Sequence, residues 1–200
     1  QWENRPARMP AKFPTYWEHV NTAYYSGLAG VMTKDCLPND ASFGFTTGEG
    51  VGIQNNESRY MTGYSYATFP IAVNDVVMCF FDPVREAIWF GLNGTWKDGT
   101  ASSASSATIL AEIESGVGTA YAVITGISAT KEWFPCVTAY GAHTTTVKFG
   151  AAGFTYTAPT NAININSANI YANDPPTIED GTAHFQTTLY TGTGASLAVS

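Results

Sequence analysis

Two short apolar runs in residues 74–96, NDVVMCFFDPVREAIWFGLNGTW, constrain the fold of this chain more than any other feature. The runs, residues 76–81 and 87–92, have the length of strands and are rich in Val, Ile, Phe and Trp. Asp82 and Pro83 lie between them and favour a turn, because proline cannot donate to a ladder of hydrogen bonds. The stretch therefore predicts an antiparallel hairpin.

A second reversal follows the hairpin at Asn93-Gly94, because both residue types accept positive φ at low cost. In a strand, successive side chains point to opposite faces of the sheet. We therefore expect Trp89 or Phe90 to be buried between two sheets.

The rest of the chain has the composition of a strand-rich protein with many tight turns. Of its 200 residues, 14% are aromatic, only 12% are charged and 19 are glycine. Residues 97–108 are small and polar and predict a flexible surface loop, and no helical period appears before Pro159. We therefore predict an all-β fold, a sandwich of two antiparallel sheets. Its further strands are expected at residues 16–20, 27–32, 42–45, 121–124, 133–139 and 144–149.

The charge and the cysteines exclude several classes of partner and cofactor. A formal net charge of −7 argues against nucleic acid, whose binding needs a basic surface that displaces counterions. No apolar run approaches the roughly 20 residues of a membrane span, so we expect no membrane insertion. Three cysteines are too few and too scattered for a disulfide framework or a zinc site, and Cys79 and Cys136 are expected to be buried free thiols. We predict no metal and no cofactor.

Catalysis finds little support in the sequence. His19, His143 and His184 have no Cys, Asp or Glu at ligand-like or triad-like spacing. Glu112 and Glu114 would share a face if their segment were a strand, and glycosidases use paired carboxylates, but two such surface glutamates are more often solvated. No motif of a nucleotide-binding loop, zinc protease or serine hydrolase occurs. We therefore predict a protein that is not an enzyme.

Several segments resemble SPRY domains, in the order in which that family has them. Residues 74–96 resemble the core hairpin, which ends in Leu-Asn-Gly. The resemblance covers residues 16–159 and implies a SPRY-like β-sandwich of the concanavalin-like jelly-roll type, in a family of binding modules without chemistry. Lys148 stands where the family has Asn, and His19 interrupts the apolar alternation of the first strand. The other matching segments are Tyr16-Trp17-Glu18, Ala29-Gly30-Val31 with Lys34-Asp35, Trp133-Phe134-Pro135-Cys136-Val137, Val147-Lys148-Phe149-Gly150 and Phe154-Thr155-Tyr156-Thr157-Ala158-Pro159.

A second, narrower resemblance covers the chain from about residue 74 onward. Residues 154–169, then Pro176-Thr177-Ile178, then residues 184–192 (HFQTTLYTG) resemble a junction between two modules of tailed-phage structural proteins. This chain departs from that pattern at Thr193. The resemblance implies a protein of the virion, from a tail fibre or a head appendage.

The chain divides into four expected parts. Residues 1–15 contain three prolines and predict an extended arm, and residues 16–159 form the sandwich. Residues 160–182 predict a Pro- and Asn-rich linker, and residues 183–200 the start of a further β-module or a docking hairpin. Because an arm or a single hairpin is not stable alone, we expect one of them to dock on another domain or another copy.

Three functions remain open at this point. The first is a virion structural module, localised to the particle and made in the bacterial host cytoplasm, whose partners are other virion proteins, copies of itself, or a host-surface glycan or protein. The alternative is an intracellular SPRY adaptor that binds a peptide through its loops. A polysaccharide-degrading appendage stands behind both. Low charge and abundant Ser, Thr, Gly and Asn favour the first.

The resemblance implies that a partner is met by loops at the ends and edge of the sheets. Aromatic and Arg side chains supply contact area at low entropic cost, and rings suit stacking on sugars. Trp96 follows the Asn-Gly turn, where it is either an exposed platform or a lid folded back on the sandwich. The candidate binding residues are Tyr24, Tyr25, Arg59, Tyr60, Tyr64 and Trp96.

Overall fold

The structure is a computed structural model, and it describes residues 2–6, 11–21, 27–36, 48–54, 59–60, 71–99, 103–140, 145–150 and 153–165. The chain separates into two compact units, Gln1–Asn166 and Ser167–Ser200. All described residues belong to the first unit. The expected module at residues 183–200, and the linker beyond residue 165, lie outside the described residues.

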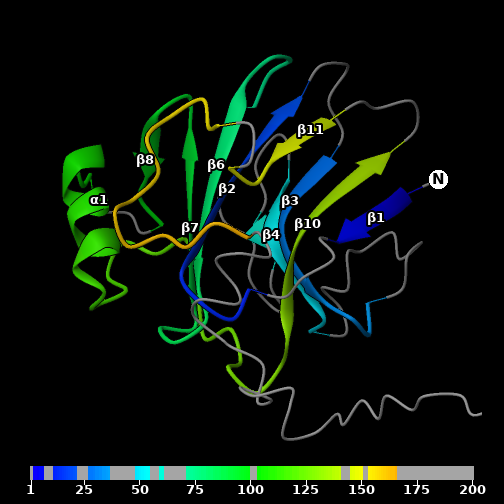
Figure 1. Cartoon of the computed structure of the whole chain (residues 1–200), viewed down its shortest axis with the longest axis horizontal. Helices are drawn as coiled ribbons and strands as arrows, with labels where there is room; N and C mark the ends of the chain where they lie inside the picture. The colour runs from blue at the N-terminus through cyan, green and yellow to red at the C-terminus, as the bar shows by residue number, and fades with distance from the viewer. Residues whose placement is uncertain are drawn as a thin grey trace, which may run out of the picture. The chain divides into compact units, whose positions relative to one another are not determined.

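The described strands form two antiparallel sheets (Figure 1). The strands of the five-stranded sheet, in spatial order, are β1 (Trp2–Pro6), β10 (Trp133–Tyr140), β3 (Gly27–Thr33), β4 (Gly50–Gln54) and β5 (Arg59–Tyr60). Those of the six-stranded sheet are β11 (Thr145–Lys148), β2 (Thr15–Asn21), β6 (Val76–Asp82), β7 (Ala87–Leu92) and β8 (Thr95–Lys97), with β9 (Ile124–Thr125) also paired to β7. The prediction of an all-β sandwich of two antiparallel sheets is confirmed.

The hairpin predicted from residues 74–96 is present as β6 and β7. Phe80 pairs with Trp89 and Cys79 pairs with Phe90 in an antiparallel register. The reversal at Asn93-Gly94 has positive φ at both residues, 49° and 83°, as a tight primed turn requires. This prediction is confirmed as well.

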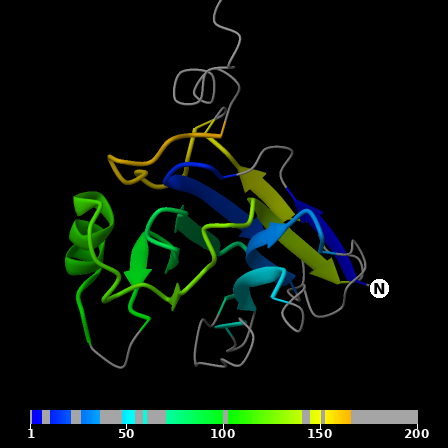
Figure 2. The same cartoon turned by 90° about the horizontal axis from the view of Figure 1, so that it is seen from below.

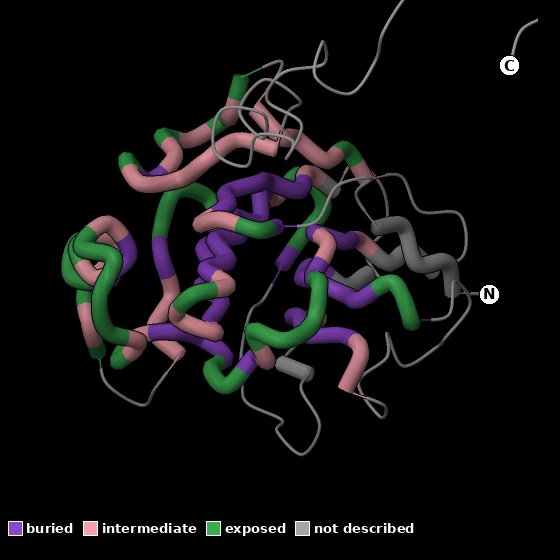
Figure 3. The backbone as a smooth tube through the Cα atoms, turned by 60° about the horizontal axis from the view of Figure 1, so that its bottom comes forward, coloured by how far each residue is buried: buried purple, intermediate pink, exposed green. Residues whose placement is uncertain are grey.

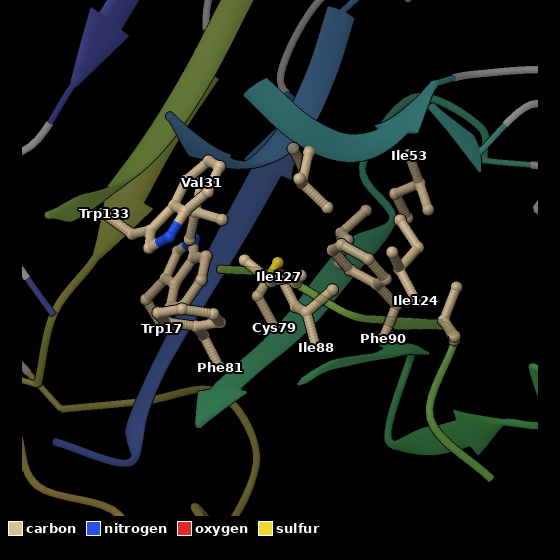
Figure 4. Close-up of a cluster of buried hydrophobic side chains, with 14 of the residues drawn as sticks. Trp17, Val31, Ile53, Cys79, Phe81, Ile88, Phe90, Ile124, Ile127 and Trp133 are labelled. Atoms are coloured by element: carbon tan, nitrogen blue, oxygen red, sulfur yellow. The ribbon is translucent and has the colours of Figure 1, made fainter. Parts of the chain in front are cut away.

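The core between the sheets is built from every second residue of the facing strands. Phe90 lies in this core, so the expectation that Trp89 or Phe90 is buried between the sheets is met by Phe90. Figure 4 shows the side chains converging from both sheets. Those labelled there are Trp17, Val31, Ile53, Cys79, Phe81, Ile88, Phe90, Ile124, Ile127 and Trp133.

The six-stranded sheet is also buried on its other side, here called the outer face. Phe80 and Trp89 point to this face and are fully buried there beneath α1 (Ser106–Ser115). All seven residues of β6 are therefore buried, which explains why residues 76–81 are continuously apolar rather than alternating. In Figure 3 the buried residues concentrate in the central strands, while α1 and the turns are mostly exposed or intermediate.

The helix α1 contradicts the sequence analysis, which predicted a loop through residue 108 and no helix before Pro159. Ser105 caps its N-terminus by accepting a hydrogen bond from the Thr108 amide, and Gly116 ends it in the left-handed conformation. Ile109 and Ile113, one turn apart, bury one face of the helix on the sheet. The helix is short, and two buried isoleucines are too few to produce a clear helical period in the sequence.

The two ends of the first unit are both attached to the sandwich. β1, which lies in the expected N-terminal arm, is an edge strand of the five-stranded sheet, pairing with β10. Residues 153–165, here called the strap, cross the outer face without forming a strand (Figure 2, yellow to orange). Phe154 and Tyr156 of the strap pack on the buried outer-face cluster.

Candidate functional site

The register of the strands shows which strand ends lie next to one another within each sheet. At one end of the six-stranded sheet lie the end of β2, the beginning of β6 and the end of β7, because Val20 pairs with Val76 and Val77 pairs with Leu92. In the five-stranded sheet, the beginning of β3 lies beside the end of β4, since Leu28 pairs with Gln54.

The strand ends just named in the six-stranded and the five-stranded sheet belong to the same end of the sandwich. Asn21 and Gly27 are six peptide steps apart, so they lie within about 20 Å of each other. Tyr140 and Thr145, at the adjoining ends of β10 and β11, are five steps apart. We call this the loop end; four connections, residues 22–26, 55–58, 93–94 and 141–144, start and finish at it.

The opposite end, here called the Arg85 end, is closed by polar contacts. It holds the β6–β7 turn, since Asp82 pairs with Ala87, and the end of β3, since Thr33 pairs with Trp133. Glu49 accepts hydrogen bonds from the Thr33 hydroxyl and from Lys131 Nζ, the latter at 2.6 Å. The bond from Lys131 is the main cause that lowers the pKa of Glu49.

Most of the predicted binding residues lie outside the described residues or are described in their backbone only. Tyr24, Tyr25 and Tyr64 lie outside the described residues. Arg59 and Tyr60 are described in their backbone only, where they form β5 opposite Ile53 and Gly52. The strands that bound the segments at residues 22–26 and 55–58 all end or begin at the loop end.

Trp96 is the one predicted binding residue whose side chain the structure describes. It is 4% exposed and lies in the outer-face cluster, edge-to-face with Tyr16 at a ring separation of 6.2 Å. Its amide donates to Ser106 Oγ at the start of α1. The indole is therefore a lid folded onto the sandwich, and it offers no surface to a ligand.

A hydrogen-bonded turn pair forms the described surface of the loop end. Asp75 Oδ2 accepts from the Ala72 amide at 2.7 Å, and Asp75 Oδ1 accepts from Asn93 Nδ2 at 2.6 Å. Asn93 Oδ1 accepts from the Val76 amide at 2.9 Å. The β7–β8 turn is thus fixed to the start of β6. The sequence analysis missed Asp75, although its place just before an apolar strand and opposite an Asn-Gly turn is a usable signal.

The buried ionisable groups are held by structural partners away from this end's surface. Glu18 is unexposed, and its carboxylate accepts from Tyr16 Oη and from the amides of Thr155 and Tyr156 at 2.7 to 2.9 Å. Burial, with Glu18 close by, raises the pKa of Tyr16 well above its usual range. Glu18 therefore secures the strap to β2.

His19 and Cys79 are inside the sandwich. His19 Nε2 accepts a 3.3 Å hydrogen bond from Trp17 Nε1, and burial lowers the pKa of His19 to about 4, so the imidazole is neutral at pH 7. Burial raises the pKa of the Cys79 thiol. Cys79 and Cys136 are both buried thiols outside any disulfide, as predicted.

Glu112 and Glu114 do not form a same-face pair, because their segment is a helix and not a strand. Glu112 accepts from Trp89 Nε1 at 3.0 Å and from the amides of Ala120 and Tyr121. Glu114 accepts from the Thr160 amide of the strap. Each carboxylate thus fastens a different segment to α1, and the geometry of a glycosidase pair is absent from these two residues.

Among the residues that the structure describes, no group of three or more His, Cys, Asp or Glu side chains is arranged to hold a metal ion. No helix among the described residues is long and apolar enough to span a membrane. No family model matches the chain, and no curated protein matches it significantly.

Proposed function

We propose that this chain is a non-enzymatic structural and binding module of a bacteriophage virion, a SPRY-like sandwich that presents its loop end to a host-surface glycan or protein. The sequence resemblance to tailed-phage structural proteins motivates the virion, and the architecture supports the binding role. The observation that carries the proposal is that the loop end and the exit of the chain from the sandwich lie at opposite ends.

The exit is fixed by the last part of the strap. The Ile163 amide donates to the Pro14 carbonyl at 2.7 Å, and Pro14 directly precedes Thr15, which pairs with Phe81 next to the β6–β7 turn. The strap therefore leads the chain to the Arg85 end before it passes beyond residue 165. The loop end and the last described residues of the sandwich therefore lie at opposite ends.

The chemistry of the loop-end segments suits recognition. Residues 22–26 contain Tyr24 and Tyr25, and Arg59 and Tyr60 lie in the short strand that follows residues 55–58. Tyr and Arg are enriched at binding hot spots, because they bring a large contact area and hydrogen-bonding groups with few rotatable bonds. Four connections at one end also resemble the way other β-sandwiches present binding loops.

The test is a binding screen of the full chain on bacterial cells, a glycan array and a peptide array. One variant carries Tyr24→Ser with Tyr25→Ser, and a second carries Tyr60→Ser with Tyr64→Ser. The matched control is Val84→Ser with Val117→Ser, which changes side chains that are 80% and 70% exposed away from the loop end. Thermal melting of all variants separates lost binding from lost folding.

We expect both tyrosine variants to lose binding to cells or glycans with little change in Tm, and the control to bind normally. Binding to short peptides alone, abolished by the same variants, would favour an intracellular adaptor instead. Binding that survives both tyrosine pairs would move the site away from the loop end and overturn the proposal.

A further inference from the structure

The loop end contains a chemically reactive dipeptide, Asn93-Gly94. Both residues are exposed, in the turn between β7 and β8. An asparagine side chain followed by glycine is prone to attack by the next backbone nitrogen, because glycine has no Cβ to obstruct the approach. The reaction needs the Gly94 nitrogen to come within near-attack distance of Asn93 Cγ, so any contact that fixes the carboxamide elsewhere slows it.

In this structure both ends of the Asn93 carboxamide are hydrogen-bonded at the start of β6. Nδ2 donates to Asp75 Oδ1 at 2.6 Å, and Oδ1 accepts from the Val76 amide at 2.9 Å. The Asn93 amide also donates to the Val76 carbonyl at 2.9 Å. The side chain can rotate toward Gly94 only after both hydrogen bonds of its carboxamide group break.

We propose that Asn93 is a latent modification site for hydrolytic deamidation, which Asp75 and Val76 hold unreactive in the folded protein. When the hydrogen bonds to Asp75 and Val76 break, the Gly94 nitrogen attacks Asn93 Cγ and loses its proton. The carboxamide nitrogen leaves as ammonia, and a cyclic imide remains. Water then adds to one of the two imide carbonyls and opens the ring to aspartate or isoaspartate.

The product changes the turn because of charge and geometry. The carboxamide donor that Asp75 accepted from is replaced by a carboxylate, so two like charges would meet at the position of a 2.6 Å hydrogen bond. The isoaspartate product also routes the backbone through the side chain and lengthens the turn. Either product weakens the attachment of the β7–β8 turn to β6, and so alters the loop end.

The first experiment measures the rate of conversion in the full chain at mildly alkaline pH, below the unfolding temperature, by peptide mass mapping and an isoaspartate assay. A synthetic peptide with the sequence of residues 88–99 gives the unrestrained rate. We expect the folded chain to convert at least about tenfold more slowly than the peptide.

Two variants identify the cause. Asp75→Ala removes the acceptor and is expected to accelerate conversion severalfold, whereas Asp75→Asn keeps an acceptor oxygen and is expected to stay slow. Glu86→Ala is the control, because it removes a carboxylate that accepts from the Ala129 amide at the other turn of the same hairpin. Circular dichroism establishes that each variant is folded.

A second experiment tests the effect of the product. Asn93→Asp imitates it and is expected to lower Tm at neutral pH, because the new carboxylate meets that of Asp75. Adding Asp75→Asn to Asn93→Asp is expected to restore most of the loss at neutral pH. Equal rates in wild type, Asp75→Ala and peptide, or a loss in Asn93→Asp that Asp75→Asn does not restore, would overturn the proposal.

Discussion

The guanidinium of Arg85 lies over the indole of Trp89, with 4.4 Å between its central carbon and the ring centroid. The same group forms an ion pair with Asp82 at 2.6 Å and donates to the carbonyls of Glu112 and Ile113 in the last turn of α1. A cation is favourable at a helix C-terminus, where the carbonyls have no partner within the helix. The β6–β7 turn therefore holds the helix on the outer face.

Replacing Arg85 should destabilise the protein strongly. The side chains of Arg85 and Asp82 are 8% and 4% exposed, so Arg85→Ala leaves a buried carboxylate without its ion-pair partner and should cost about 3–5 kcal/mol. Arg85→Lys keeps the charge but not the planar fork and should cost less. Urea unfolding measures both. Lys34→Ala, which breaks an exposed pair with Asp35, is the control and should cost less than about 1 kcal/mol. A cost for Arg85→Ala as small as that of this control would contradict the role of Arg85 in holding α1 on the outer face.

Trp89 should contribute to stability through both volume and a hydrogen bond. Trp89→Ala empties a fully buried site beneath α1 and should cost about 3–5 kcal/mol. Trp89→Phe keeps most of the apolar area but removes the donor to Glu112, and should cost about 1–2 kcal/mol more than its lost area predicts. Val84→Ala, at an 80% exposed side chain, should be neutral within about 0.5 kcal/mol. Denaturant midpoints that do not place Trp89→Ala lowest, Trp89→Phe next and Val84→Ala near the wild type would contradict these two contributions of Trp89.

His19 should make stability fall in mild acid. Burial lowers its pKa from 6.5 to about 4 in the folded state, so between these values the unfolded chain binds the proton more readily. The contribution of the neutral imidazole is complete above pH 6.5 and is lost as the pH falls toward 4, by up to about 3 kcal/mol.

The variant His19→Gln keeps an acceptor for Trp17 and does not titrate. Urea unfolding from pH 7.5 to 4 should therefore show a steeper loss in the wild type than in His19→Gln. Parallel curves for the two proteins would show that His19 is not the group responsible.

Glu18 should control the opening of the strap. Glu18→Gln places an amide group where three donors converge, so at least one hydrogen bond is lost, at about 1–3 kcal/mol. Hydrogen exchange at the amides of Thr155 and Tyr156 should become roughly tenfold faster for each 1.4 kcal/mol lost. Glu132→Gln, at an exposed residue, is the control. Unchanged protection of the two amides would mean that the strap is held by its apolar contacts alone.

The fold could be predicted where the signal is local. The apolar runs of β6 and β7, the Asp82-Pro83 turn and the Asn93-Gly94 turn each follow from neighbouring residues, and the structure has all of them. The helix could not be recognised in the same way, because a ten-residue helix carries only two fully buried side chains.

The candidate site was predictable only in part, since contacts distant in sequence decide it. Glu18 lies in a predicted strand, yet two of its hydrogen-bond partners are 137 and 138 positions away in the strap. Trp96 follows an exposed turn, and only α1 and Tyr16 show that it is covered. No local pattern encodes either relationship.

The strap also sets an order of events during synthesis. Tyr16 is made long before Phe154 of the strap, whose ring centroid lies 4.7 Å from that of Tyr16, so the part of the outer face that the strap covers stays exposed until residues 153–165 have left the ribosome. Exposed apolar surface of this kind makes nascent and truncated chains prone to aggregate. A ribosome stalled before residue 153 would therefore carry a sandwich with exposed apolar surface, and a chaperone bound there would be displaced by residues 153–165.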